Sequence, residues 1–138
     1  LREDGSFPIR SHMLHEGIRF PLGVASAGMA VLAYLSDAEI DAYLARTDLV
    51  PSYGDEHTAA AVRARVAITR ADGYALNPGL LVEGSWGMGA AVFDADERPQ
   101  WALSLTGIEQ RFTAARRGDL GPLLLRAAHE LTTALRRR

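Results

Sequence analysis

The chain contains no cysteine, and this absence excludes disulfide bonds, thiolate nucleophiles and thiolate-based zinc sites. It also lacks an apolar run that could cross a bilayer, because the longest one, residues 21–35, is short and interrupted by proline and glycine. No signal peptide is visible, so we expect a cytoplasmic protein. The net charge of −2 gives this segment no basic face with which to bind nucleic acid by itself.

What is present is the composition of an ordinary globular domain. The chain has 138 residues, of which 48% are hydrophobic and 23% are charged, and this fits one domain with one core. It begins without methionine, on what resembles the end of a strand. We therefore expect a single domain over residues 1–138 that is the C-terminal part of a longer protein.

Hydrophobic periodicity and turn residues predict helices flanking an antiparallel sheet, which is an α+β fold. The predicted strands cover residues 7–14, 74–76, 80–82, 88–93 and 100–106. The predicted helices cover residues 25–35 and 58–71, with another starting at Ser36 and a last one running from residues 119–122 to the end. Ser36 and Glu39 have the spacing of a capping box, and Gly73 is typical of a helix end. Residues 49–54 and 77–79 are expected to form a loop and a turn.

The most informative stretch, residues 16–35, leads an extended segment into a helix that begins with Ser26, Ala27 and Gly28. The first N–H groups of a helix have no intrahelical partner, and the helix dipole places partial positive charge there. Small side chains at that point let a carboxylate or phosphate approach. The alternative is a tightly packed junction between strand and helix, and the residues alone leave both interpretations open.

Two further features favour a ligand without requiring one. Ser104 and Thr106 are two residues apart on a predicted strand, so both hydroxyls point to one face, either into solvent or over a cavity. The glycine-rich run at residues 84–89 leads into a strand, which excludes a dinucleotide-binding fingerprint. Its glycines serve either close packing or ligand access.

Metal binding and nucleophilic catalysis find little support. The four histidines, His12, His15, His57 and His129, have no metal-ligand spacing. Ser26 lies in a sequence that loosely resembles a nucleophile elbow, but the first glycine of that motif is missing. His129 and Asp119 would have to complete a triad by coincidence. We expect no metal, no cofactor and no enzymatic activity.

Four segments in order carry a resemblance to a known family. They are EGIRFPLGVASAGMAVLAYL, a helix ending in DGYA, EGSWGMGAAVFDADERPQWALSLTG, and a C-terminal helix. Together they resemble the effector-binding domain of the IclR family of bacterial transcription factors. The resemblance implies a GAF-like α+β domain, which in the family is joined to an N-terminal winged helix-turn-helix that binds DNA.

In that family, effectors lie between the sheet and the small-residue loop. Carried over by motif, the resemblance implies a ligand site made of Ser26, Ala27, Gly28, Asn77, Gly87, Ser104 and Thr106, with Phe20, Ile9 and Ser85 along its wall. Family members often carry an acidic residue where Asn77 stands and a cysteine where Gly87 stands. These departures predict a less polar pocket that is roomier at one end, and hence a larger organic acid or an aromatic compound as the effector.

The expected function is therefore that of a ligand-sensing domain of a transcriptional regulator, assembled as a homodimer or homotetramer. Its partners would be a small-molecule effector and DNA. It would contact DNA only through a winged-helix domain that is absent from this chain. Two alternatives stay open. One is a small serine-dependent hydrolase that uses Ser26, and the other is a GAF-like module that serves assembly without a ligand.

Overall fold

The computed structural model describes residues 5–6 and 15–137 of the chain. In these ranges the elements are α1 (Ser26–Ala33), α2 (Asp37–Arg46), α3 (Val50–Tyr53), η1 (Asp55–His57), α4 (Ala59–Asp72), β1 (Ala75–Pro78), β2 (Ser85–Phe93), β3 (Pro99–Ile108), η2 (Glu109–Arg111) and α5 (Ala114–Arg136). The strand predicted at residues 7–14, and with it the predicted site residue Ile9, lies outside the described residues.

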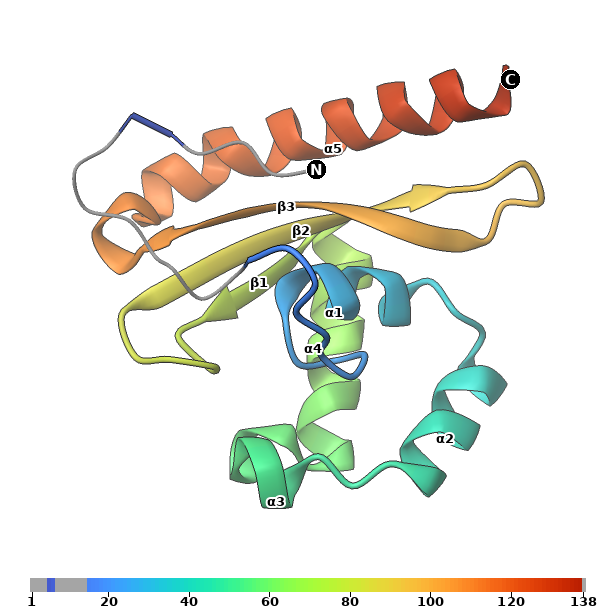
Figure 1. Cartoon of the computed structure of the whole chain (residues 1–138), viewed down its shortest axis with the longest axis vertical. Coiled ribbons are helices and arrows are strands. Elements are labelled where there is room, and N and C mark those ends of the chain that lie inside the picture. Colours follow the sequence, from blue (N-terminus) through green and yellow to red (C-terminus); the bar gives the residue numbers. More distant parts are fainter. Residues whose placement is uncertain (1–4, 7–14, 138) are drawn as a thin grey trace.

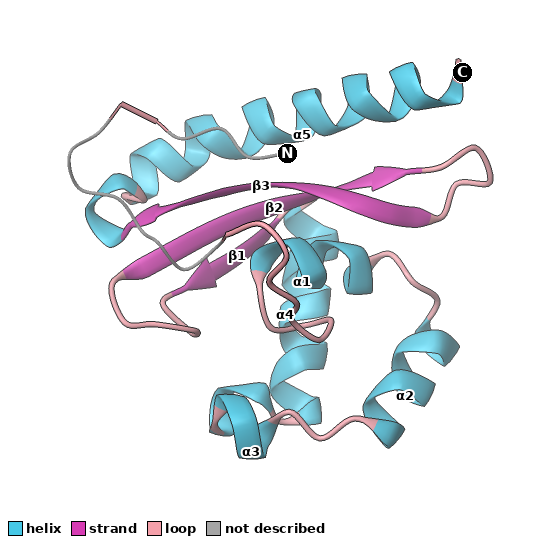
Figure 2. Cartoon of the chain, viewed as in Figure 1, coloured by secondary structure: helices cyan, strands magenta, loops and turns pink. Residues whose placement is uncertain are grey.

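The described strands form one antiparallel sheet in the order β1-β2-β3, with β2 in the centre. Figure 1 shows α5 running along one face of this sheet, while α1 and α4 cover the other. Figure 2 shows the same arrangement as a layer of strands between helices. The α+β fold with flanking helices is thus confirmed, and its two faces bury separate groups of side chains.

Alternation along β2 explains why helices pack on both faces. Met88, Ala90 and Val92 point toward α5 and join one buried cluster. The intervening residues point toward α1, and at two of these positions, Gly87 and Gly89, the side chain is absent. A strand without side chains at these positions lets a helix approach the sheet backbone closely.

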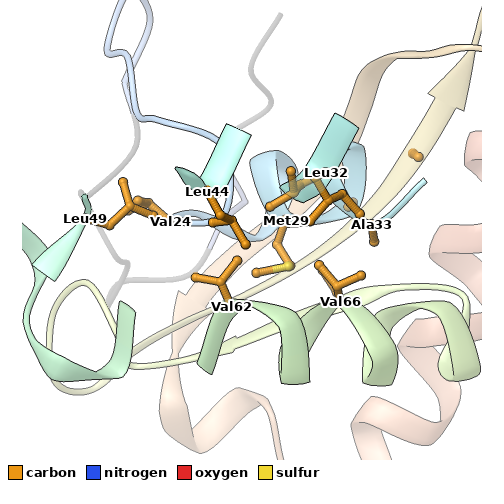
Figure 3. Close-up of a cluster of buried hydrophobic side chains, with 12 residues drawn as sticks. Val24, Met29, Leu32, Ala33, Leu44, Leu49, Val62 and Val66 are labelled. Carbon is orange, nitrogen blue, oxygen red and sulfur yellow. The ribbon is translucent and has the colours of Figure 1, made fainter. Parts of the chain in front are cut away.

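A second buried cluster joins α1 to α4 and to the segments that follow α1. Figure 3 shows Met29 and Leu32 of α1 meeting Val62 and Val66 of α4. Arg70 of α4 also holds the end of α1, because its guanidinium donates to the Ala33 carbonyl at 2.6 Å. These contacts fix where α1 begins relative to the sheet.

Four sequence-based predictions of elements or their boundaries are wrong. Asn77 and Pro78 belong to β1, where an edge strand tolerates a residue without an N–H group, and residues 80–82 form no strand. The segment 49–54, predicted as a loop, contains α3. Helix α5 begins at Ala114, five residues before the earliest predicted start, and Thr113 caps it by accepting from the Arg116 amide. Pro122 therefore lies inside this helix.

A buried histidine predicts a specific response to acid. Burial first, and the neighbouring Arg65 charge second, lower the pKa of His57 below its usual 6.5, so the folded chain holds the neutral ring. The stability that depends on this neutral ring is complete above about pH 6.5 and is lost as the pH falls from there toward the folded-state pKa. We expect the melting temperature to fall between about pH 7 and pH 5 more steeply in the wild type than in His57→Asn. Identical pH profiles for the two proteins would contradict this assignment.

Candidate functional site

The first turn of α1 has unpaired backbone donors. Ala25, the N-cap residue, is extended and offers no side-chain cap, and the first intrahelical bond runs from the Met29 amide to the Ala25 carbonyl at 2.9 Å. The N–H groups of Ser26, Ala27 and Gly28 therefore have no acceptor within the helix. A carboxylate is the ligand that such a helix start favours.

The start of α1 rests directly on the glycines of β2. A Cβ atom added at Gly89 would lie 2.5 Å from the Ser26 carbonyl oxygen and 3.0 Å from the Ala27 nitrogen. A Cβ at Gly87 would lie 3.0 Å from the Ser26 hydroxyl oxygen. At Gly89 a side chain would collide with the backbone of α1, so close packing explains the glycine. At Gly87 a side chain would instead meet the hydroxyl of Ser26.

Asn77 connects β1 to the segment before α1. Its amide nitrogen donates to the Val24 carbonyl at 2.9 Å, and its side-chain oxygen accepts from the Leu80 amide at 2.9 Å. The residue is 6% exposed. Because both ends of the amide are already hydrogen-bonded, Asn77 positions the start of α1 and holds the chain after β1.

A small cleft lies where these parts meet. It is lined by residues of α1, β1, β2 and β3 and of the loop after β1, namely Ala25, Ser26, Asn77, Leu81, Ser85, Trp86, Gly87 and Thr106. Its volume is about 20 Å³, which holds about one water molecule. The prediction of a roomier pocket is wrong for this conformation, because the space beside the β2 glycines is taken by Ser26 itself.

The structure brings half of the predicted site residues together. Ser26, Asn77, Ser85, Gly87 and Thr106 line the cleft, and Phe20, Ala27, Gly28 and Ser104 do not. Gly28 faces the turn at Pro21 and Leu22 instead. Ser104 pairs with Gly89 and Thr106 pairs with Gly87, and both residues are exposed although Thr106 borders the cleft.

The sequence analysis missed Ala25 and Leu81, and it treated Trp86 only as an unplaced apolar side chain. Leu81 follows a strand end and carries no local signal for its position over the cleft. Ala25 was identifiable as the residue before a helix start. Trp86 also lies under the Arg117 guanidinium, 5.1 Å from the ring centroid, which fixes its ring against α5.

The serine-hydrolase arrangement is not assembled. Ser26 is buried on the α1 side of the sheet, whereas His129 and Asp119 belong to α5 on the opposite face. Over the ranges that the structure describes, no group of three or more acidic or histidine side chains could hold a metal ion. None of the helices described in these ranges is both long and apolar enough to span a membrane.

Comparison with known proteins agrees with the fold. The family model for the C-terminal part of the bacterial transcriptional regulator IclR matches residues 9–133. The chain belongs to the IclR family. The segments quoted above for the resemblance all fall within or next to this range.

Two curated IclR-family relatives are repressors by name. The chain is 30% identical over 120 residues to the transcriptional repressor IclR of Escherichia coli, and this match covers 86% of the chain and 43% of that protein. It is 28% identical over 119 residues to the acetate operon repressor of Salmonella typhimurium, again covering 86% of the chain and 43% of the relative. The chain thus spans less than half the length of these relatives.

Solved structures show the same fold. The repressor BlcR of Agrobacterium tumefaciens aligns with a TM-score of 0.82 at 22% identity, over 91% of this chain and 51% of that one. The C-terminal domain of the Escherichia coli transcriptional regulator KdgR aligns with a TM-score of 0.77 at 23% identity, over 87% of this chain and 74% of that one. At these identities the likeness concerns the fold alone.

Proposed function

We propose that this chain is one effector-binding domain, residues 1–138, of an IclR-family transcriptional regulator, and that the effector occupies the cleft at the start of α1. The observation that carries the proposal is that the start of α1, which has no side-chain cap, lines the cleft through Ser26, together with Ser85 and Thr106. The proposed ligand is a small organic acid or an aromatic metabolite. Its carboxylate would accept from the N–H groups at the start of α1, and its remaining atoms would contact Leu81.

Ligand entry requires the cleft to open, because a volume of about 20 Å³ admits nothing larger than water. Leu81 lies in the segment between β1 and β2, which is flanked by Gly79 and Gly84, both with positive φ. The Gly84 carbonyl accepts from the Glu109 amide at 2.8 Å, so this end of the segment is anchored, and a shift would have to occur between Gly79 and Gly84. We propose that displacement of Leu81 enlarges the cleft when the effector binds.

The regulatory partners belong to the proposal as well. Effector binding would shift a population of domain arrangements in a homodimer or homotetramer, and thereby the spacing of attached winged-helix domains that bind DNA. The net charge of −2 is consistent with DNA contact through another part of the protein. The proposed location is the cytoplasm, and the proposed activity is regulation without catalysis.

A thermal-shift screen with aliphatic and aromatic carboxylates tests the proposal. A hit that raises the melting temperature progressively with ligand concentration supports it. The small volume of the closed cleft favours one competing function, a GAF-like module that serves assembly without a ligand. A screen without any hit would support that module and contradict the effector site.

Thr106 offers a direct test of the proposed contacts. Thr106→Val keeps the shape of the side chain and removes the hydroxyl, so the effector identified in the screen should bind more weakly by about 0.5–3 kcal/mol, depending on the charge of its partner atom. Calorimetric titration measures the difference. Ser104→Ala is the control, because Ser104 lies on the same face of β3 but outside the cleft lining, and we expect it to matter less. Equal losses in both variants, or none in Thr106→Val, would count against this site.

A further inference from the structure

A second and larger cleft lies at the end of α4 that is remote from the sheet. It has a volume of about 490 Å³, within the range of small-molecule sites. One wall is the last turn of α2 with the residues after it, through Val50, and the other is the start of α4 with Thr58 and Ala59. Figure 1 places α2 and α3 at this end of α4, away from the three strands.

One residue that lines this cleft, His57, has a buried ring nitrogen without a hydrogen-bond partner among the residues that the structure describes. His57 is 2% exposed. Its Nδ1 lies 2.9 Å from the Tyr53 carbonyl oxygen, and since a carbonyl only accepts, Nδ1 carries the proton. Nε2 then has a free lone pair, and no hydrogen-bond donor reaches it among the described residues. A buried acceptor left unpaired is costly, so a ligand that donates to it gains affinity.

The two walls offer opposite groups to a ligand. At the end of α2, the last carbonyl groups lack intrahelical donors. The Asp48 carboxylate, which accepts from the Val50 amide through one oxygen at 3.1 Å, adds negative charge. Arg46 also lines the cleft, but its guanidinium turns back along α2, where it donates to the Ala42 carbonyl and lies over the Tyr43 ring. The α2 wall therefore favours a cation.

At the start of α4 the backbone donates. Thr58 accepts from the Ala61 amide through its hydroxyl and from the Val62 amide through its carbonyl. The N–H groups of Ala59 and Ala60 precede these bonds and have no acceptor within the helix. This wall favours an anion, and the buried Leu44 and Leu49 between the walls favour an apolar group.

We propose that this cleft binds a small apolar α-amino acid, with its ammonium group toward Asp48 and the His57 Nε2 and its carboxylate at the start of α4. The site is separate from the effector cleft, since no residue lines both. Such a ligand would bridge α2 and α4 and hold the segment between them.

The experiment is a ¹⁵N-resolved NMR titration of the chain with L-valine and its two truncated forms, isovalerate, which lacks the ammonium group, and isobutylamine, which lacks the carboxylate. L-valine should move the amide signals of Thr47, Ala59 and Ala60, and it should bind at least about tenfold more tightly than either truncated form. The signals of Gly87 and Thr106 report on the effector cleft separately, so failure of one site is distinguishable from failure of the other.

Two variants assign the contacts. Asp48→Asn, at an exposed position, and His57→Asn, which keeps a donor for the Tyr53 carbonyl, should each weaken L-valine binding about tenfold. Asp55→Asn alters a nearby carboxylate that does not line the cleft and should leave binding unchanged. Equal binding of all three compounds, no movement of the Thr47 and Ala59 signals at the highest soluble concentration, or full affinity in Asp48→Asn would overturn the proposal.

Discussion

Replacing Gly89 with alanine is expected to lower the free energy of unfolding by about 3 kcal/mol. The added methyl group would meet the Ser26 carbonyl oxygen at 2.5 Å, and backbone atoms of a packed helix start cannot move aside as a flexible side chain does. Either α1 shifts away from β2 or the strand bends, and both open the core below. Chemical denaturation followed by circular dichroism measures the loss of stability. Because the proposed effector site lies at the start of α1, a shift of α1 should also lower the affinity for the effector.

Gly118→Ala is the matched control. Gly118 lies on an exposed turn of α5, and no atom lies within 4 Å of a Cβ built there. Alanine favours helix over glycine by about 1 kcal/mol, so this variant should be as stable as the wild type or slightly more stable. If Gly89→Ala matches Gly118→Ala in stability, the close contact between α1 and β2 described above is wrong.

Replacing Asn77 with alanine should cost about 2 kcal/mol of stability. The buried Val24 carbonyl would lose its donor and the Leu80 amide its acceptor, in a place that water reaches poorly. Because Val24 precedes the start of α1, effector affinity is also expected to fall although Asn77 has no spare group for the ligand. Denaturation and ligand titration of the same variant measure the two effects.

Asn77→Asp separates the two hydrogen bonds. A carboxylate can still accept from the Leu80 amide, but it cannot donate to the Val24 carbonyl. We therefore expect a stability well below that of the wild type, together with weaker binding of an anionic effector at the nearby helix start. Wild-type stability in Asn77→Asp would show that the Val24 bond contributes little.

Short sequence motifs correctly predicted two helix ends that are fixed by residues adjacent in the chain. The capping box of Ser36 and Glu39 is confirmed, with both reciprocal bonds present. Gly73 ends α4 in the left-handed conformation, as predicted. Such motifs are readable because each is completed within a few residues of the chain.

Helix boundaries that depend on tertiary packing could not be predicted from such motifs. Gly118, Gly121 and Pro122 favour a break, yet α5 continues through all three. A Cβ at Gly121 would overlap the Tyr74 ring, so this glycine serves close packing of the helix on the segment before β1. The contacts of a long helix with the sheet outweigh the local cost of residues that favour a break.

In the candidate site, too, local motifs predicted which residues are neighbours but not how closely they pack. The motifs identified Ser26, Asn77, Gly87 and Thr106 as neighbours, and they do line one cleft. Whether glycine leaves a cavity or admits a neighbouring group depends on how closely α1 approaches β2. That distance is set by the core between α1 and α4, which joins residues thirty positions apart, as Leu32 and Val62 are.

Amide chemical-shift mapping of a bound carboxylate tests the effector site most directly. The ¹⁵N-labelled chain would be titrated with benzoate and with the carboxylate that gives the largest rise in melting temperature. We expect the largest shifts at Ser26, Ala27 and Gly87, with a smaller response in Thr106→Val at equal ligand concentration. Largest shifts at residues away from the start of α1, with these three signals unmoved, would show that the effector binds elsewhere.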